Sequence, residues 1–345
     1  MTARDEIVTT NLALQGGGAH GAFTWGALDR LLEERDLQFE AITATSAGAM
    51  NAAMLVTGLA RGGRDGAKAL LEEFWRKIVE RSAGPRSPFA MFALPPDPKM
   101  LRSFYEYSPG WLFTDWLTRT FSPYQLNPLN LNPLRDLLEE LIDFDEVCGE
   151  TGPQVFVNAT DVESGRPKVF TGFDITTDAI LASACLPYLF QAVEIDGRSY
   201  WDGGYMGNPA IYPLIYGSKC RDVLIVHINP ILREEVPHSA GDIANRINEI
   251  SFNASLMREM RAIDFVQRLI DDGVISPDRW KRMRVHSIRD DDTMRAFGVA
   301  TKLAPDWAVI SELREAGRRT ADDWLKASKA NIGKRDSVDI RADFL

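Results

Sequence analysis

The chain has 345 residues, of which 45% are hydrophobic and 26% are charged, which suits a globular protein with one large core or two small ones. Its formal net charge of −10 argues against a nucleic-acid partner and against electrostatic attraction to anionic lipid head groups, so any membrane contact must depend on apolar surface. The three cysteines Cys148, Cys185 and Cys220 are spaced neither as a disulfide framework nor as metal ligands.

The first residues of the chain lack the long apolar run of a secretory signal. No later stretch approaches the roughly 18 uncharged apolar residues of a membrane-spanning helix. We therefore expect a cytoplasmic protein that can also lie at the inner face of the membrane as a peripheral protein.

Strand-like and helix-like segments alternate along the chain, which predicts an α/β fold with a mainly parallel sheet. Asp196 and Gly197 separate two short strand-like runs, which is the signal of a two-residue hairpin leading into Asp202. In chain order we expect a strand at 7–14, a helix at 22–34, a strand at 41–45, a helix at 47–59, and strands at 155–160 and 223–229.

The first motif, Gly-Gly-Gly-Ala-His-Gly, lies between the first strand and the first helix. Glycines let the backbone turn sharply and bring its N–H groups close to a ligand, and the helix N-terminus adds partial positive charge. We expect an oxyanion hole formed by Gly16, Gly17 and Gly18, with Gly21 supporting the turn. The same glycines satisfy the dinucleotide pattern G-x-G-x-x-G, with Glu40 near the distance of a ribose-binding acid, so a nucleotide site is an alternative.

The second motif, Ala-Thr-Ser-Ala-Gly, ends the second strand and opens the second helix. A nucleophile elbow places its serine on such a turn with the hydroxyl exposed, which makes Ser46 the candidate nucleophile. Small residues such as Gly48 suit the close approach of strand and helix. The usual pattern is G-x-S-x-G, and Ala44 replaces its first glycine by the smallest alternative. A serine that caps the helix is the structural alternative.

The third motif is Asp-Gly-Gly, at Asp202, Gly203 and Gly204. A carboxylate followed by two glycines suits a tight loop that could bring Asp202 beside Ser46. Taken alone, the same three residues are typical of an ordinary turn.

With these three motifs in this order, the sequence resembles the patatin-like phospholipase family over roughly residues 11–217. The similarity includes Thr160 and Asp161 and the run Ser-Ala-Cys-Leu-Pro at 183–187. It implies a three-layer α/β fold with a mainly parallel central sheet flanked by helices and with helical C-terminal additions. It divides the chain into a catalytic domain at 11–217, with an aromatic-rich insertion or lid at about 85–133, and C-terminal strands and helices at 218–345 that pack on the core.

The resemblance also implies a lipid acyl hydrolase of the phospholipase A or lysophospholipase type. Ser46 would be the nucleophile and Asp202 its base, in a dyad without histidine, metal or cofactor, and the substrate would be a lipid or another acyl ester. The family usually has Arg or Lys where this chain has His20. A neutral imidazole there predicts a weaker positive field and a lower level of activity, with the reaction type unchanged.

Two functions other than a Ser-Asp hydrolase are compatible with the same sequence. The chain order of an α/β-hydrolase triad would fit Ser46, Asp202 and then His227 or His286, although His227 lies in an apolar run typical of a core strand. The other rival is a binding or scaffold protein that keeps the fold with little turnover. The head group, positional preference and oligomeric state are left open by the sequence.

Two further segments carry apolar patterns. In the helix expected at about 239–272, apolar side chains recur every three or four residues, and we expect this stripe to pack against the core rather than to meet a membrane or a partner. Its members are Ile243, Ile247, Ile250, Ala254 and Met257. The insertion holds many aromatic residues, which would form the wall or lid of an apolar cleft or else fill the core. The large apolar residues of the insertion, all aromatic except Met91, include Phe89, Met91, Phe92, Phe104, Tyr105, Trp111, Phe113, Trp116, Phe121 and Tyr124.

Overall fold

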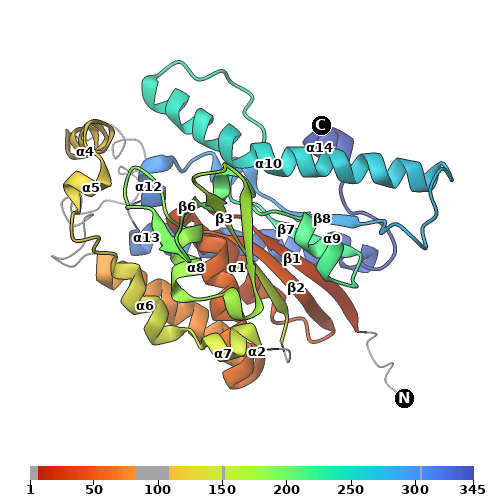
Figure 1. The fold of residues 1–345 in the computed structure, drawn as a ribbon. Coiled ribbons are helices and arrows are strands. Elements are labelled where there is room, and N and C mark those ends of the chain that lie inside the picture. The colour runs from red at the N-terminus through yellow and green to blue at the C-terminus, as the bar shows by residue number, and fades with distance from the viewer. Residues whose placement is uncertain (1–6, 83–108, 150–151, 304) are drawn as a thin grey trace.

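The computed structural model describes residues 7–82, 109–149, 152–303 and 305–345, and only the backbone of residues 109–112 and 115. Within these residues an eight-stranded sheet lies at the centre, in the order β5-β6-β3-β2-β1-β7-β8, with β4 paired to β3 outside this path (Figure 1). The strands are β1 (Val8–Leu14), β2 (Leu37–Thr45), β3 (Gln154–Asp161), β4 (Pro167–Thr171), β5 (Val193–Ile195), β6 (Arg198–Asp202), β7 (Asp222–Val226) and β8 (Arg284–Ile288).

The sheet is mainly parallel, as predicted. Strands β3, β2, β1, β7 and β8 run parallel to one another, whereas β4 and β6 pair with β3, and β5 with β6, in antiparallel fashion. Every residue of β7 and the last five of β1 are buried. Such continuous burial is expected of parallel strands that are covered by helices on both faces.

Helices form a layer on each face of the sheet, which gives three layers in all. Leu12, Leu14 and Leu224 point into one apolar cluster, whereas Ala13 and Ile225 point into the other, as the two-residue period of a strand requires. The first cluster includes α1 (Gly21–Leu31), α2 (Ala47–Ser82), α6 (Pro133–Leu141), α7 (Phe144–Cys148), α8 (Thr177–Ser183) and α13 (Trp307–Ser328). The second includes α9 (Tyr212–Gly217), α10 (Ala240–Asp271) and α14 (Ile340–Phe344).

Helix α2 is a pair of helical arms rather than one rod. Its path breaks at Gly62 (φ −156°) and Gly63 (φ +61°). The arms then pass so closely that a β-carbon on Gly58 would lie 2.4 Å from the Cα of Ala67. The second arm thereby brings Trp75 back against α1, where it stacks on Trp25 with ring centroids 6.5 Å apart. Both arms can therefore line one cavity.

The predicted hairpin is confirmed. Asp196 and Gly197 both have positive φ, at 52° and 73°, as a two-residue turn of this kind needs. Strands β5 and β6 pair on either side of it, with Ile195 opposite Arg198. The hairpin delivers Asp202 to the last position of β6.

The chain beyond residue 217 completes the same sheet. Strand β7 lies between β1 and β8, and helix α13 crosses α1 at close range. A β-carbon on Gly26 would lie 1.9 Å from the carbonyl oxygen of Arg314, and one on Gly317 would lie 2.0 Å from that of Phe23. Glycines on both helices thus allow the two backbones to touch.

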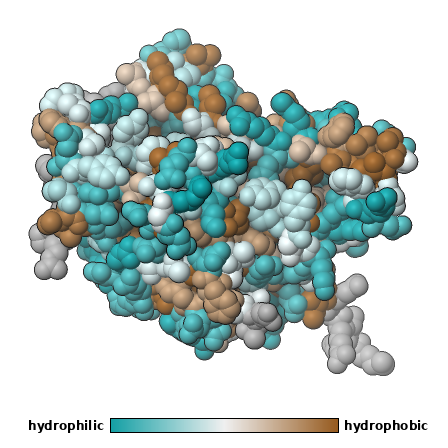
Figure 2. Space-filling model, in the orientation of Figure 1, coloured by the Kyte–Doolittle hydropathy of each residue, from teal (hydrophilic) through white to brown (hydrophobic). Residues whose placement is uncertain are grey.

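The helix expected at 239–272 is present as α10, but the expectation that its isoleucine stripe packs on the core is wrong for the first half. Ile243, Ile247 and Ile250 are 42%, 60% and 54% exposed, whereas Glu249 and Asn253 are buried. Figure 2 shows apolar residues gathered over this outward-facing part of α10. The inward face is polar because it borders buried polar groups that need hydrogen-bond partners.

Part of the aromatic insertion falls on helices α4 (Pro109–Thr120) and α5 (Pro123–Leu126), which lie together at one edge of the molecule (Figure 1). The side chains of Phe113, Trp116, Phe121 and Tyr124 are exposed, which contradicts the view that these four fill the core. Phe89, Met91, Phe92, Phe104, Tyr105 and the side chain of Trp111 lie outside the described residues. In the parts of the chain that the structure describes, no helix combines the length and the apolar character needed to cross a membrane.

Candidate active site

Ser46 lies on the tight turn between β2 and α2. Its φ of 54° is in the left-handed region, which residues other than glycine seldom adopt. A helix-capping serine would instead have an extended backbone. The Ser46 N–H donates to Oγ of Ser183 at 2.8 Å, which holds the turn in place. The geometry is that of a nucleophile elbow.

The glycines around Ser46 are explained by direct contacts. A β-carbon on Gly48 would lie 2.4 Å from the carbonyl oxygen of Leu14, and one on Gly16 would lie 2.6 Å from the β-carbon of Ser46. On Gly21, it would lie 2.7 Å from the β-carbon of Ala47. The glycine loop, the elbow and the first turns of α1 and α2 therefore pack backbone against backbone.

Asp202 ends β6 and is buried. A carboxylate oxygen accepts a hydrogen bond from the Gly204 N–H at 2.7 Å. The two following glycines are needed for space, since a β-carbon on Gly203 would lie 2.1 Å from the carbonyl oxygen of Asn158, and one on Gly204 would lie 2.3 Å from the Phe252 ring. The Asp-Gly-Gly motif is thus a packed corner of the site and not an ordinary surface turn.

The structure brings Ser46 and Asp202 together. Burial raises the pKa of Asp202 to about 7, while the Gly204 N–H, the Ser46 side chain and the charge of Lys302 lower it in part. The carboxyl group therefore gains and loses its proton near neutral pH, beside the serine hydroxyl. A carboxylate with an ordinary pKa would be a much weaker base.

The glycine loop presents two of its three expected N–H groups. Gly18 has a φ of 57°, and a β-carbon there would lie 2.4 Å from the carbonyl oxygen of Lys302. The Gly16 N–H is already used, because it donates to Oδ1 of Asn208 at 2.7 Å. The expectation that Gly16 donates to an oxyanion is therefore corrected. Among the described residues, the N–H groups of Gly17 and Gly18 have no hydrogen-bond partner.

A set of buried amide side chains fixes this loop from behind. The carbonyl oxygen of Gly16 accepts from Nδ2 of Asn229 at 3.0 Å and from Nδ2 of Asn208 at 3.4 Å. Gln15 donates to Oδ1 of Asn253 at 3.1 Å, and its Oε1 accepts from the Asn229 N–H at 3.0 Å. The loop is therefore preorganised before any ligand is present.

His20 is buried and neutral. The Thr301 hydroxyl donates to the carbonyl oxygen of Gly298 at 2.8 Å, so at the 2.8 Å contact between His20 and Thr301 the Nε2–H of the histidine is the donor. Burial, and the nearby charge of Lys302, hold the pKa of His20 well below its usual range. The loop itself thus carries no positive side chain.

Lys302, from helix α12 (Val299–Leu303), is a half-buried residue whose ammonium lies beside the loop. Its ammonium donates to Oδ1 of Asn229 at 2.7 Å and to Oδ1 of Asn248 at 2.8 Å. Burial lowers the pKa of Lys302 to about 8, against the opposing effect of Glu249 and Asp202. The side chain remains mostly protonated at neutral pH.

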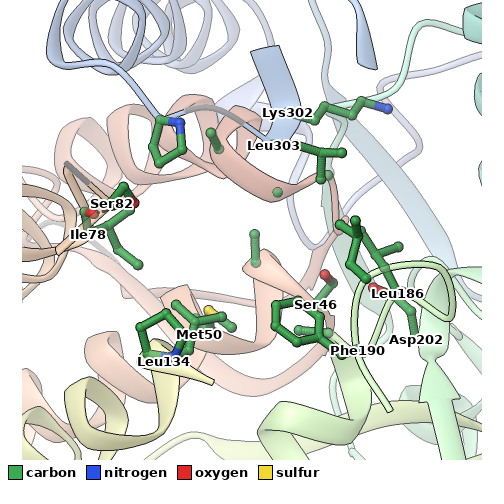
Figure 3. A pocket seen from close by; sticks show the side chains of 18 of the residues that line it. Ser46, Met50, Ile78, Ser82, Leu134, Leu186, Phe190, Asp202, Lys302 and Leu303 are labelled. Atoms are coloured by element: carbon green, nitrogen blue, oxygen red, sulfur yellow. Dashed lines mark hydrogen bonds between the residues drawn. The ribbon is translucent and has the colours of Figure 1, made fainter. Parts of the chain in front are cut away.

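Ser46 and Asp202 border a cavity of about 190 Å³. Figure 3 shows Ser46 and Asp202 at one end of it and Ile78 and Ser82 at the other. Both arms of α2, helix α6, the turn after α8 and helix α12 supply a mainly apolar wall. Its apolar members include Met50, Phe74, Ile78, Leu134, Leu137, Leu186, Phe190 and Leu303.

The exposed aromatic side chains of α4 and α5 do not line the cavity. Among the described residues of the insertion, Pro133 at its end contributes to the wall, followed by Leu134 and Leu137 of α6. The aromatic residues expected at 89–105 lie outside the described residues, so their part in the wall stays a prediction.

Neither candidate histidine joins Ser46 in a triad. His286 contacts Oδ1 of Asp222 and Oγ of Ser337, both at 3.0 Å, and Asp222 is the first residue of β7, far from the carboxyl end where Ser46 lies. Both ring nitrogens of His227 lack a partner among the described residues, and its ring packs on Phe344. Burial lowers the pKa of His227 to about 3. These are structural histidines.

The alternative of a nucleotide site would need the Glu40 carboxylate to bind a ribose, but this carboxylate has other partners. Glu40 accepts hydrogen bonds from the Ser218 hydroxyl at 2.9 Å and from the Cys220 N–H at 3.2 Å. Its carboxylate is therefore engaged at the start of β7. In the described part of the chain, no three His, Cys, Asp or Glu side chains are grouped as ligands for a metal ion.

Four supporting residues of the site were missed by sequence reasoning. Ser183 lies within the recognised run Ser-Ala-Cys-Leu-Pro, so its position carried a signal. Asn208, Asn229 and Lys302 carried none, because they reach the loop only through contacts between residues about 190 to 280 positions apart in the chain.

Comparison with models of protein families matches residues 12–215 to a family described as patatin-like phospholipase. A search of curated proteins gives no match. Among solved structures, the chain is similar to VipD from Legionella pneumophila, with 15% identity, a TM-score of 0.34, and coverage of 89% of this chain and 67% of VipD. It is also similar to ExoU of the Pseudomonas aeruginosa type III secretion system, solved in complex with SpcU, with 14% identity, a TM-score of 0.35, and coverage of 94% of this chain and 54% of ExoU.

Replacing Asp202 by Asn should raise the melting temperature at pH 8. Burial lifts the pKa of the folded Asp202 to about 7, so above that pH the folded state holds the carboxylate charge in a buried place, whereas the unfolded chain carries the same charge in water. An amide avoids this charge and can still accept from Gly204. We expect a rise of about 5 °C at pH 8, shrinking as the pH falls from 7 towards 4. Scanning calorimetry of wild type and Asp202→Asn measures it, with the exposed Glu194→Gln as control, and a lower melting temperature for Asp202→Asn at pH 8 would contradict it.

Proposed function

Since the matched family model covers more than half of the chain, the protein belongs to the patatin-like phospholipase family, and we propose that it is a serine lipid acyl hydrolase of the phospholipase A or lysophospholipase type. The observation that carries the proposal is the meeting of two side chains. Ser46, on a strained turn, faces a buried Asp202 at the end of an apolar cavity and beside the N–H groups of Gly17 and Gly18.

In the acylation step, Oγ of Ser46 attacks the carbonyl carbon of the ester while its proton passes to the carboxylate of Asp202. A bond forms between Oγ and the carbonyl carbon, and the carbonyl oxygen gains the negative charge. The N–H groups of Gly17 and Gly18 then stabilise that charge. When the intermediate collapses, the ester C–O bond breaks and the leaving alcohol takes the proton from Asp202.

Deacylation repeats the same proton transfers with water. A water molecule attacks the acyl-enzyme and gives a proton to Asp202, and the second intermediate collapses to a free fatty acid and the serine hydroxyl. Asp202 returns the proton to Ser46. A pKa near neutrality suits this role, because the same carboxyl group must accept and then release a proton in each half-reaction.

The cavity supports an acyl substrate. Its wall is mainly apolar from Met50 to Ile78, so an alkyl chain bound at Ser46 would exchange water for hydrocarbon contacts. Polar groups line the end where the ester would react, and Ser82 lies at the opposite end. A mainly apolar section between the two ends suits the acyl chain of an amphipathic lipid.

We further propose that the protein reaches lipid surfaces through exposed apolar side chains. Phe113 and Trp116 of α4 are 52% and 54% exposed, and their rings lie 5.8 Å apart. Exposed neighbouring aromatics of this kind can insert into the interfacial region of a bilayer. With a net charge of −10, the chain has no general attraction to anionic head groups.

The central test is the replacement Ser46→Ala, which removes the nucleophile and little volume. We expect a folded protein whose ester hydrolysis is reduced at least about 1,000-fold and which no longer reacts with a fluorophosphonate probe. The measurements are turnover of defined phospholipid and lysophospholipid substrates, and probe labelling. Replacing Ser183 by Ala, which keeps the nucleophile, should leave labelling at Ser46 detectable. Undiminished turnover by a folded Ser46→Ala protein would refute the proposal.

Hydrolysis should increase with pH through about 7. Asp202 can accept the serine proton only when ionised, and its pKa in the folded protein is raised to about 7, so below that pH kcat/KM should fall about 10-fold per unit. Hydrolysis of p-nitrophenyl butyrate between pH 5 and 8.5 measures this profile. The variant His227→Ala should keep the same acidic limb, and loss of the limb in this variant would assign the base to histidine.

Lipid binding should depend on α4. Replacing Phe113 and Trp116 by serine should weaken co-sedimentation with vesicles, at low and high salt alike, while sparing hydrolysis of a short soluble ester. The matched control replaces Tyr216 and Trp280, which are 84% and 53% exposed elsewhere on the surface. Equal vesicle binding by the two double variants would show that α4 is not the contact surface.

A further inference from the structure

A half-buried lysine, Lys302, connects the C-terminal part of the chain to the candidate oxyanion hole. Lys302 lies on α12, outside the residues that match the family model. Figure 3 shows its side chain leaving the cavity beside Leu303, with the ammonium directed away from the apolar wall. The charge is therefore not placed to meet an acyl chain directly.

The hydrogen bonds of Lys302 lead to one peptide group. Its ammonium donates to Oδ1 of Asn229 at 2.7 Å, and Nδ2 of Asn229 donates to the carbonyl oxygen of Gly16 at 3.0 Å. That carbonyl belongs to the same peptide as the N–H of Gly17. The hydrogen bonds thus run from the ammonium of Lys302 through the Asn229 amide to one peptide group. The N–H of that peptide, on Gly17, is proposed to bind the oxyanion.

We propose that Lys302 is a positioning residue of the oxyanion hole, which acts through Asn229 to orient and polarise the peptide between Gly16 and Gly17. The proposal rests on the function proposed above, since it gives a role to the same loop. The loop has no cation of its own, because its basic residue, His20, is neutral. Lys302 supplies that positive charge from a remote segment.

The physical effect follows from hydrogen-bond cooperativity. A donor that bonds to a peptide carbonyl increases the polarity of the N–H on the other side of that peptide, and hydrogen bonds in series strengthen one another. Burial increases the effect because little solvent screens it. The charge that develops on the ester oxygen in the transition state would therefore be stabilised more than the neutral ground state.

Lys302 keeps its charge available for this purpose. Among described residues, no carboxylate lies within salt-bridge distance of its ammonium. The nearest acidic group on α10, Glu249, is already paired with Arg233 at 2.6 Å and with Arg246 at 3.1 Å. The remaining charged neighbour is Asp202, whose carboxylate form Lys302 favours.

The proposal predicts two separate changes in the variant Lys302→Met. The kcat for p-nitrophenyl butyrate should fall about 10-fold or more while KM changes less than about threefold, since an indirect effect should cost less than the 100- to 1,000-fold loss of a donor. The acidic limb of the pH profile should also move to higher pH, because the loss of a nearby positive charge raises the pKa of Asp202. The shift of the limb reports the charge of Lys302 near Asp202, and a fall in kcat above pH 8, where Asp202 is ionised in both proteins, reports the oxyanion hole; a lysine that only fills space would change neither.

Two further variants separate the charge from the relay. Lys302→Arg keeps a positive donor and should recover part of kcat. Asn229→Asp can still accept from Lys302 but cannot donate to the Gly16 carbonyl, so its kcat should fall like that of Lys302→Met. Lys281→Met is the matched control, since Lys281 is also a half-buried lysine, bonded to the carbonyl oxygens of Leu214 and Ser218.

All rates are expressed per Ser46 titrated to completion with a fluorophosphonate, so misfolded protein does not count. Loss of kcat in Lys302→Met and Asn229→Asp, with Lys281→Met at the wild-type rate, would support the proposal. If the wild type is active and Lys302→Met keeps its kcat and acidic limb, the proposal is overturned while the hydrolase function stands. If Lys302→Met does not fold, a wild-type kcat in Asn229→Asp would still overturn the proposal for Lys302.

Discussion

The site depends on the packing of three backbone segments at the carboxyl ends of β1 and β2. The loop after β1, the turn at Ser46 and the first turn of α2 approach so closely that a β-carbon at Gly16 or Gly48 would overlap its neighbours. Side chains cannot separate these segments, so their peptide groups face one another in a buried space. Buried N–H and C=O groups must then be satisfied or left for a ligand. This requirement explains the amides of Asn208 and Asn229, which occupy some of these groups and leave others open.

The same burial has an opposite effect on the acid. A carboxylate at Asp202 would be more stable in water, and its raised pKa is the measure of that cost. Only the Gly204 N–H, the Ser46 side chain and the ammonium of Lys302 offset it. The fold therefore holds the ionised Asp202 in an unfavourable state, which the apolar clusters on both faces of the sheet must compensate. The burial that makes the Asp202 carboxylate more basic also lowers the stability of the folded protein at pH values where Asp202 is ionised.

Much of the fold and the meeting of Ser46 and Asp202 could be predicted because each motif is short and continuous in the sequence. The glycines that follow Ser46 and Asp202 stand within two residues of them, although the contacts that require these glycines are made with distant residues such as Leu14 and Phe252. The hairpin turn is likewise recognised from two adjacent residues, Asp196 and Gly197. The orientation of α10 could not be predicted, because a 3.6-residue period shows which side chains share a face but not which face turns inward. The use of the Gly16 N–H by Asn208 could not be predicted either, since 192 residues separate them.

The outward position of the isoleucines of α10 and the position of Lys302 on α12 have a common explanation. The inward face of α10 places Asn248 against the ammonium of Lys302 and Asn253 against Gln15, so polar side chains there complete the network behind the loop. An apolar inward face would leave those groups buried without partners, at a cost of about 1–3 kcal/mol each. The isoleucines are consequently displaced to the outside. The polarity of one loop near the N-terminus thus determines which side of a helix more than 220 residues later faces the core.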